Sequence, residues 1–344
     1  MMETDLATAV RAAVDAWIQL TTAKDQLAAL DAPATLSASL ATAAEQLLRD
    51  KGLDLEVVRG LVMKVPYCHL RQAFNPAQLP HTPTDFTPVP NTQATIAARA
   101  AVLAIHGMLK LETVAYSTEN GGNLFVNLVP LQGEGLIPEK SRKGMRGHTD
   151  GVSFPLSGEK NAEYSRIAPS PELVTLAGLR NSNEVPTRVI PLENILSSLH
   201  ARDIAELKKP QYSITSQKTF VQGMKAVLGK ELVVIDEPIL KDVGSNTHIR
   251  YSHSNVEPTE LGGVAEHAAK NLEDACNKVA ISVVVLPGDI LVINNRLSLH
   301  GRAEIGDVVG TTARWLLRSY ALDTSTLEVN QRHNGNHPSY VLFP

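Results

Sequence analysis

Cysteine is scarce in this sequence, and the two residues present do not form a recognisable site. Cys68 and Cys276 are the only cysteines among 344 residues, and neither has a Cys or His partner at the spacing of a zinc site. A disulfide between them is one interpretation, but nothing in the sequence requires it, and two reduced thiols are the simpler one. The sequence therefore favours a cytoplasmic protein without a cysteine-based zinc site.

Long apolar stretches and an excess of positive charge are also absent. The net charge is -4 with both signs mixed along the chain, so we expect neither a nucleic-acid nor an anionic membrane partner. The longest apolar region, residues 96–109, is interrupted by Arg99 and His106 and is too short to cross a bilayer. Residues 1–24 carry charges among their alanines and lack the apolar core of a signal peptide. We expect a soluble protein that acts on a small molecule; the sequence does not indicate an oligomeric state.

What the sequence does contain is a helical first third followed by many short strands. Helices are predicted at residues 6–30, from 35 or 37 to 50, and at 93–111, and five prolines between residues 76 and 90 exclude regular structure there. β-type runs, separated by turn signals, occur at residues 113–116, 124–129, 173–176, 188–190, 231–235, 249–251, 280–286, 290–293 and 313–322. Two helical segments, at 192–207 and 260–278, interrupt them. This pattern predicts an α+β protein in which a helical region, 1–112, packs on an antiparallel sandwich or barrel, 113–344, as one integrated domain.

The first candidate for chemistry is the pair His148 and Asp150. On a strand, residues two apart point to the same face, so this imidazole and this carboxylate would project together. Two imidazoles and one carboxylate form the facial triad of non-haem iron(II), which leaves coordination positions open. The pair alone is weak support, because 11 histidines and 36 acidic residues give about one such pair by chance.

The block that ends in His300 strengthens this prediction. A Pro-Gly-Asp turn at residues 287–289 starts an apolar strand, residues 294–296 break it, and a second short strand ends at His300. Gly301 follows at once and permits close packing beside a site. The sequence therefore predicts a metal site formed by His148, Asp150 and His300.

Two arginines follow on a strand that is otherwise apolar. Arg314 and Arg318 are four residues apart, so with Leu316 they share one face of a strand. Burying two guanidinium groups is costly unless each meets an anion, and guanidinium suits bidentate binding of carboxylates. A cavity that holds two carboxylates would explain both residues.

These features together resemble the clavaminate synthase-like branch of the taurine dioxygenase superfamily, which includes hydroxylases of free arginine, asparagine and lysine. The resemblance extends from about residue 114 to about residue 322 and is sharpest at four segments: 120–130, 147–150, 294–302 and 314–318. It implies a double-stranded β-helix (jelly roll) core with N-terminal and inserted helices and a lid. It also implies an iron(II)- and 2-oxoglutarate-dependent dioxygenase that uses O2, releases succinate and CO2, and hydroxylates an unactivated C–H bond of a free L-amino acid.

The resemblance assigns roles to individual residues. His148, Asp150 and His300 resemble the iron ligands, and Arg314 resembles the partner of the 2-oxoglutarate C5 carboxylate, with Thr187 supplying a hydroxyl to that carboxylate. Arg318 resembles the arginine that binds the α-carboxylate of the substrate. Asn120 lies where relatives often have a Gln that contacts the substrate.

Each of these residues also has a simpler interpretation. Thr187 would also suit an ordinary strand, Arg318 would suit an ion pair with a buried acid, and Asn120 precedes Gly121 as in a plain turn. The basic run at residues 139–146 is either a solvated loop or a mobile lid over the site.

The sequence departs from the family at two positions. Relatives commonly have Glu where Asp150 stands; a ligand carboxylate at this position argues against a halogenase. The arginine hydroxylases hold the guanidinium of their substrate with acidic residues, whereas residues 250–255 here include serines and His253. Basic and amide side chains remain favoured substrates. The alternatives are another small carboxylate, a sulfonate or a peptide-bound residue, or a jelly-roll binding module without catalysis.

Overall fold

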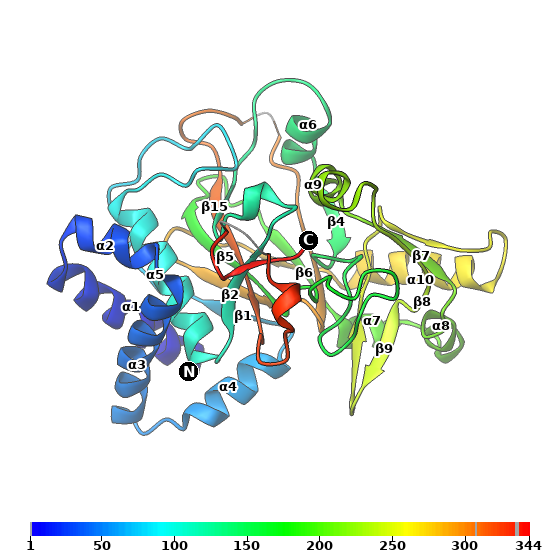
Figure 1. The fold of residues 1–344 in the computed structure, drawn as a ribbon, viewed down its shortest axis with the longest axis horizontal. Coiled ribbons are helices and arrows are strands. Elements are labelled where there is room, and N and C mark those ends of the chain that lie inside the picture. The colour runs from blue at the N-terminus through cyan, green and yellow to red at the C-terminus, as the bar shows by residue number, and fades with distance from the viewer. Residues whose placement is uncertain (1, 307, 334–336) are drawn as a thin grey trace.

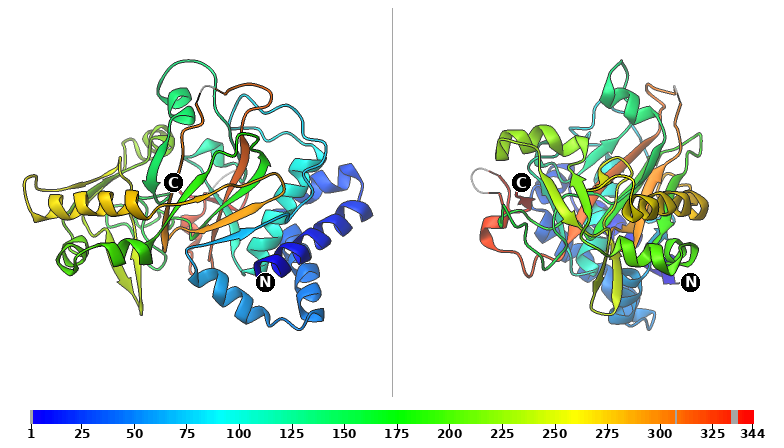
Figure 2. Two further views of the ribbon diagram at one scale, coloured as in Figure 1. Left: turned by 180° about the vertical axis from the view of Figure 1, so that it is seen from behind. Right: turned by 90° about the vertical axis from the view of Figure 1, so that its right-hand side faces the viewer.

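The computed structural model describes residues 2–306, 308–333 and 337–344, and its helices and sheets are stacked in layers (Figure 1, Figure 2). The N-terminal helices form the outermost layer on one side of the molecule. They are α1 (Met2–Leu20), α2 (Ala23–Leu30), α3 (Pro33–Asp50), α4 (Leu55–Lys64) and α5 (Gln93–Met108). No helix among the described residues combines the length and apolar character needed to cross a membrane.

Helix α5 is the innermost of these helices and is buried on almost all sides. It begins at a capping box in which Thr92 and Thr95 satisfy each other's backbone N–H groups. Its many alanines allow close approach, and Ser37 of α3 donates a hydrogen bond to the Leu103 carbonyl oxygen at 2.8 Å. One apolar core joins these helices to the outer face of the large sheet, including Leu173, Trp315 and Leu317.

The large sheet has seven strands, in the order β1-β13-β5-β15-β2-β16, with β3 paired to β15. Its strands are β1 (Tyr67–Leu70), β2 (Glu112–Tyr116), β3 (Val126–Leu128), β5 (Leu173–Arg180), β13 (Ile290–Asn294), β15 (Trp315–Leu322) and β16 (Val341–Leu342). All pairs are antiparallel except β16 with β2. Strand β5 is buried along almost its whole length because both faces of the sheet are covered.

The small sheet faces the large one and has four strands, in the order β12-β6-β14-β4. Its strands are β4 (Met145–His148), β6 (Thr187–Pro191), β12 (Ile281–Val283) and β14 (Ser298–Arg302). A second apolar core lies between the sheets and includes Val189 and Val283 from the small sheet and Leu316 and Tyr320 from the large one. Residues alternate as predicted on β15, because Leu316 faces this inner core whereas Trp315 and Leu317 face the helices.

The remaining elements cover the outer face and the ends of the small sheet. The helices are α6 (Leu136–Arg142), α7 (Leu192–Ser198), α8 (Ala201–Leu207), α9 (Lys218–Leu228) and α10 (Val264–Val279). The short strands are β7 (Tyr212–Thr215), β8 (Val233–Glu237), β9 (Leu240–Val243), β10 (Asn246–Ile249) and β11 (Val256–Pro258), and two 3-10 turns are η1 (Asn120–Gly122) and η2 (Val329–Gln331). A third apolar core, under α7, α8 and α10, joins them to the small sheet.

The mixed helix-and-sheet architecture predicted from the sequence is confirmed, and several of its elements differ from the prediction; among them, α9 was not predicted and the predicted helix at 192–207 is two helices, α7 and α8. The helix predicted over 6–30 is two helices, because Thr22 caps a new one at Ala23. Helix α4 and strand β1 were not predicted; α4 is short and β1 has only four residues. The predicted strand at 231–235 is shifted to Val233–Glu237, and the predicted strand at 280–286 is reduced to Ile281–Val283.

A buried histidine links α5 to the large sheet and generates a stability prediction. Nδ1 of His106 lies 2.8 Å from the Thr113 hydroxyl and Nε2 lies 2.8 Å from the Thr175 hydroxyl. Burial lowers the pKa of His106 to about 3, so the folded protein keeps it neutral. Because the unfolded chain binds this proton at a pKa of about 6.5, the contribution of His106 to stability is full above that pH and is lost as pH falls towards 3.

We therefore expect His106→Gln to lower the free energy of unfolding at pH 7.5 by about 1–3 kcal/mol, because one hydroxyl loses its partner. The variant should also show a shallower loss of stability between pH 6.5 and 5 than the wild type, by up to about 1.4 kcal/mol per pH unit. Urea unfolding at several pH values measures both quantities. Equal slopes in the two proteins would contradict the prediction.

Candidate metal centre and active site

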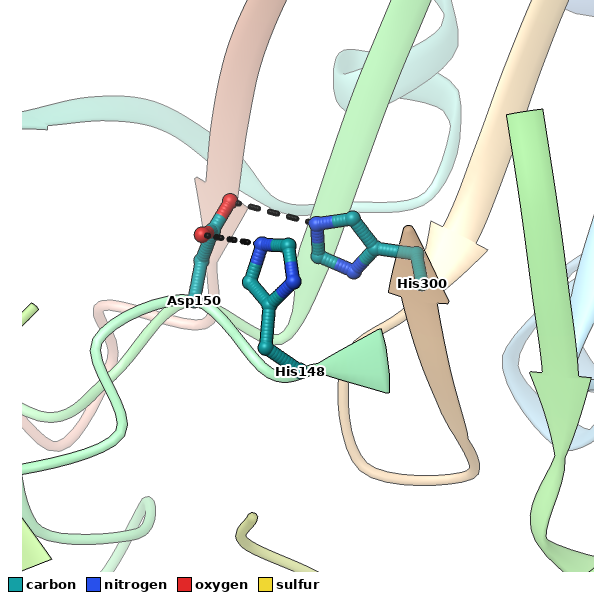
Figure 3. Close-up of side chains that lie close together, drawn as sticks. All are labelled: His148, Asp150 and His300. Carbon is teal, nitrogen blue, oxygen red and sulfur yellow. Dashed lines mark ion pairs between the residues drawn. The ribbon is translucent and has the colours of Figure 1, made fainter. Parts of the chain in front are cut away.

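The small sheet brings the three predicted metal ligands together. His148 ends β4, and its backbone lies directly opposite His300 of β14, so the two imidazoles project side by side from neighbouring strands. One ligand atom from each of His148, Asp150 and His300 lies within 4.8 Å of the others (Figure 3). Among the described residues this is the only group of three or more His, Cys, Asp and Glu side chains with such geometry.

The prediction that His148 and Asp150 share one strand is wrong in detail. Strand β4 ends at His148, and Asp150 lies in the turn that follows. The turn returns the carboxylate to the histidines, so that Oδ1 lies 3.6 Å from Nε2 of His148 and Oδ2 lies 3.5 Å from Nε2 of His300 (Figure 3). The three side chains therefore converge because of a turn and a strand pair, not because of strand alternation.

Asn295 and Gln217 hold this turn, and the sequence did not identify either as part of the site. Asn295 accepts a hydrogen bond from the Asp150 backbone N–H and donates one to its carbonyl oxygen, both at 2.9 Å. Gln217 accepts from the Gly151 N–H at 2.9 Å, and its Nε2 lies 3.4 Å from Asp150 Oδ1. The signal for Asn295 was present in the segment 294–296, which was interpreted only as a strand break.

The electrostatic environment keeps His148 and Asp150 in the protonation states that a metal ion requires. Burial and the neighbouring His300 lower the pKa of His148 to about 4. Burial alone would raise the pKa of Asp150, but the hydrogen bond and charge of His300, with His148 and Arg318, hold it well below its usual range. Nδ1 of His148 lies 3.0 Å from the Arg146 carbonyl oxygen and must donate to it, which leaves the Nε2 lone pair free for a ligand. A neutral imidazole beside an ionised carboxylate is the donor set that a divalent metal binds.

Arg314 is a buried cation without an acidic partner among the described residues. It is 6% exposed, and its Nε has no hydrogen-bond partner. Its one hydrogen bond runs from Nη2 to the Thr187 hydroxyl at 3.3 Å. Burial lowers the pKa of Arg314 to about 9, and the nearby Arg302 adds to the shift. Thr187 lies two residues along β6 from Val189, which pairs with His300, so this cation lies beside the metal-ligand strands.

Arg318 has an acidic partner, which is Glu119. The guanidinium donates to both carboxylate oxygens, at 3.0 and 2.7 Å, and Tyr320 donates its hydroxyl to the same carboxylate at 3.1 Å. Burial would lower the pKa of Arg318, but the charge of Glu119 raises it above the ordinary value, and Asp150 contributes to the same effect. The buried ion pair considered from the sequence is therefore present, and it lies within electrostatic reach of the triad.

The remaining candidates lie at the margin of the site or outside it. Asn120 begins the turn η1 with a φ of 49°, so the plain-turn interpretation is correct for its backbone, and the preceding residue, Glu119, carries the side chain that faces Arg318. His253 contacts the Gly147 carbonyl oxygen at 2.8 Å and lies against Tyr251, part of the core under α10. Gly301 is required: a Cβ there would lie 2.4 Å from the Met145 carbonyl oxygen.

The fold and the triad define a class of protein: the chain has the fold of non-haem iron oxygenases. A solved structure of the iron oxygenase OrfP with iron, succinate and (3S)-hydroxy-L-Arg matches with a TM-score of 0.73 and 19% identity, over 98% of this chain and 97% of that one. An asparagine oxygenase with Fe(II), a hydroxyasparagine and succinate matches with a TM-score of 0.69 and 21% identity, over 90% and 88%. Similarity at this level of identity establishes the fold.

Sequence comparison identifies relatives that share part of the chain. An L-lysine 3-hydroxylase from Catenulispora acidiphila is 24% identical over 209 residues, 60% of this chain and 54% of the relative. An L-asparagine oxygenase from Streptomyces coelicolor is 31% identical over 86 residues, 25% of each chain. The match thus spans about half of the first relative and a quarter of the second, and no family model matches the chain. The resemblance to free amino-acid hydroxylases stated from the sequence motifs is confirmed.

The triad geometry predicts the effect of removing each ligand. His148→Ala or His300→Ala should weaken binding of Fe(II), or of Co(II) as a stable probe, by more than about 100-fold. Loss of a residue that only hydrogen-bonds to a metal ligand typically lowers metal affinity by about 10- to 100-fold, and loss of a ligand should cost more. Asn295→Ala should fall in that smaller range, because Asn295 holds the backbone of Asp150. Anaerobic calorimetry measures these affinities.

The matched control is His267→Ala, because His267 is an exposed histidine on α10. Its metal affinity should equal that of the wild type. Full metal affinity in the His148 and His300 variants would contradict the assignment of the site.

Proposed function

We propose that the protein is an iron(II)- and 2-oxoglutarate-dependent dioxygenase that hydroxylates an unactivated C–H bond of a free L-amino acid. The observation that carries the proposal is Arg314, a buried guanidinium beside the metal-ligand strands that has a hydroxyl partner but no carboxylate among the described residues. A buried cation of this kind is costly unless an anion joins it. A dicarboxylic co-substrate that also reaches the metal supplies that anion.

On this proposal, His148, Asp150 and His300 hold the iron. Two imidazoles and one carboxylate occupy three coordination positions on one side and leave the others for ligands. When bound, iron(II) with 2-oxoglutarate and O2 supplies the oxidising power for C–H hydroxylation, with release of succinate and CO2. The part of the protein in this chemistry is to position the ligands and to exclude water.

Arg314 and Thr187 bind the distal carboxylate of 2-oxoglutarate. The guanidinium forms a bidentate, charge-assisted pair with it, and the Thr187 hydroxyl donates a further hydrogen bond. The unpartnered Nε of Arg314 supports this role, because a buried donor without an acceptor is rare unless a ligand completes it.

Arg318 and Glu119 bind the two charged groups common to all free amino acids. The guanidinium takes the α-carboxylate and the Glu119 carboxylate takes the α-ammonium, so a zwitterion replaces the internal ion pair with two pairs of its own. Asn120 contacts the substrate from the adjoining turn. This complementarity favours a free amino acid over a sulfonate or a peptide-bound residue, and the named substrates of the relatives favour a basic or amide side chain.

The two facing sheets form the double-stranded β-helix on this proposal, and residues 1–112 and 113–344 form one integrated domain. The apolar core that α1, α3 and α5 share with Leu173, Trp315 and Leu317 supports the second statement, because neither part buries these residues alone.

A screen of free L-amino acids tests the activity directly. With iron(II), ascorbate, O2 and 2-oxoglutarate, at least one basic or amide amino acid should accelerate succinate release and yield a hydroxylated product. Its N-acetyl and α-amide derivatives should lose about 100-fold in kcat/KM, because each leaves one buried charge of the Glu119–Arg318 pair unmatched. If no amino acid stimulates turnover although iron and 2-oxoglutarate bind, the proposed reaction is wrong.

Replacing Arg314 separates a ligand-binding role from a structural one. Arg314→Met should weaken 2-oxoglutarate binding by about 100-fold or more, because a bidentate charge pair is lost. The same change should leave the ligand-free protein equally stable or more stable, because it removes an unpaired buried charge. Thr187→Val should cost only about tenfold in affinity.

Anaerobic titration of the iron–2-oxoglutarate absorption band and thermal unfolding without ligands measure the two effects. A lower melting temperature with unchanged 2-oxoglutarate affinity would show that Arg314 is structural.

A further inference from the structure

Arg302 connects the strand of His300 to the helix that precedes the His148 strand. Its Nη2 donates to the carbonyl oxygens of Lys140, Ser141 and Lys143, at 3.3, 2.8 and 3.0 Å. These carbonyls belong to the last turn and the C-cap of α6. The last carbonyls of a helix lack partners within it and form the negative end of its dipole, so a guanidinium is well suited to this position.

The position of α6 depends on a small number of contacts. The helix has seven residues and no side-chain cap at its N-terminus, and a helix this short is marginal without tertiary contacts. Apart from Arg302, its last turn is held by the N–H of Ile305, which donates to the Arg142 carbonyl oxygen at 2.9 Å, and by the Ser141 hydroxyl, which accepts from the Leu131 N–H at 2.8 Å. Two of these three anchors, Arg302 and Ile305, come from β14 and the segment after it, and β14 is the strand that carries His300.

Arg302 also lies beside the proposed 2-oxoglutarate site. Arg302 pairs across the sheet with Thr187, whose hydroxyl accepts from Arg314. The charge of Arg302 acts on Arg314, and burial lowers the pKa of Arg302 itself to about 10. Neither arginine has an acidic partner among the described residues. Two buried cations therefore lie near each other without a counter-charge among the described residues.

Helix α6 adjoins the strands that carry the metal ligands, because it leads into β4 and contacts Arg302, two residues from His300 on β14. Figure 1 shows α6 at the upper edge of the molecule, above α9 and β4. Partial burial and the neighbouring Lys218 lower the pKa of Lys140 on α6, and Asp150 opposes the shift, so the Lys140 ammonium lies within electrostatic reach of the triad. The basic run at 139–146, interpreted from the sequence as a lid or a solvated loop, overlaps this helix at residues 139–142.

We propose that Arg302 is a positioning residue that couples α6, as a lid, to occupancy of the co-substrate site. The inference rests on the proposed function. Without a dicarboxylate, the charges of Arg302 and Arg314 repel each other and the hold on α6 is weakened. When the distal carboxylate binds Arg314, it neutralises this repulsion, and Arg302 holds the α6 carbonyls firmly over the metal before the substrate reacts.

Hydrogen exchange of residues 136–143 tests the coupling, with Arg302→Gln as the disruptive variant and Arg302→Lys as the conservative one. In the wild type, Co(II) with 2-oxoglutarate should slow exchange in this segment. Arg302→Gln should exchange about tenfold faster without ligands, because the C-cap is lost, and 2-oxoglutarate should no longer slow it. Arg302→Lys keeps the positive charge but lacks the planar guanidinium donors, so its exchange rate in residues 136–143 should lie between those of the wild type and Arg302→Gln.

Turnover supplies a second readout that a merely structural role would not change. Arg302→Gln should release succinate in excess of hydroxylated product, because an open lid admits water, while its Co(II) affinity stays within about twofold of the wild type. Arg188→Gln is the matched control: Arg188 lies on β6 beside Thr187 but is exposed on the opposite face, and neither readout should change.

The outcomes separate the two proposals. If 2-oxoglutarate does not bind the wild type with Co(II), the proposed function fails, and the coupling fails with it. If 2-oxoglutarate binds, but slows exchange of residues 136–143 equally in the wild type and in both Arg302 variants, the function survives and the role of Arg302 is overturned. If Arg302→Gln does not fold, the comparison of Arg302→Lys with the wild type decides in the same way.

Discussion

Burying guanidinium groups beside and between two sheets is the constraint on which the rest of this structure depends. Five buried or nearly buried arginines meet it differently, and Arg250 pairs with Glu237. Arg296 donates to the hydroxyl and carbonyl oxygen of Ser170, Arg302 donates to the end of α6, and Arg318 pairs with Glu119. Arg314 has only the Thr187 hydroxyl. The other four have carboxylate or carbonyl partners within the described chain, whereas Arg314 has neither, which supports a ligand at that position.

Strand β14 organises the site around this requirement. Its neighbour β4 supplies His148, its neighbour β6 supplies Thr187, and the turn that leads into it contains Asn295. The strand itself carries His300 and Arg302, two residues apart on one face. A single short strand thus contributes to the proposed metal site, the proposed co-substrate site and the support of α6. Gly301 is the condition for this arrangement, because any side chain there would collide with the backbone of β4.

The layered architecture could be predicted because it follows from periodicity. Apolar residues three or four apart predicted α3 and α5, and strands β2, β3, β5, β13 and β15 of the large sheet follow from their apolar runs. The convergence of His148, Asp150 and His300 could be predicted from the order and spacing of the motifs. The turn that brings Asp150 back could not, because it depends on Asn295, 145 residues away.

Glu119 was missed for a related reason. A lone Glu before Asn-Gly-Gly gives no local signal, and only the pairing of β15 with its neighbours brings Arg318 to it. Side chains that serve a site by long-range contacts are in general not visible in the local pattern of the sequence.

The ion pair between Glu119 and Arg318 has a consequence for which molecules can occupy the proposed substrate position. Any molecule that binds Arg318 there must first break the ion pair between Arg318 and Glu119. If that molecule is an anion without a cationic group, the Glu119 carboxylate is left charged, buried and without a partner. A zwitterion avoids this cost. On the proposed assignment, the pair acts as an internal competitor that excludes simple carboxylates, including a misplaced second 2-oxoglutarate and the departing succinate. Acids without a cationic group therefore bind at Arg314, which has no carboxylate partner among the described residues, whereas zwitterions bind at Arg318, which is paired with Glu119.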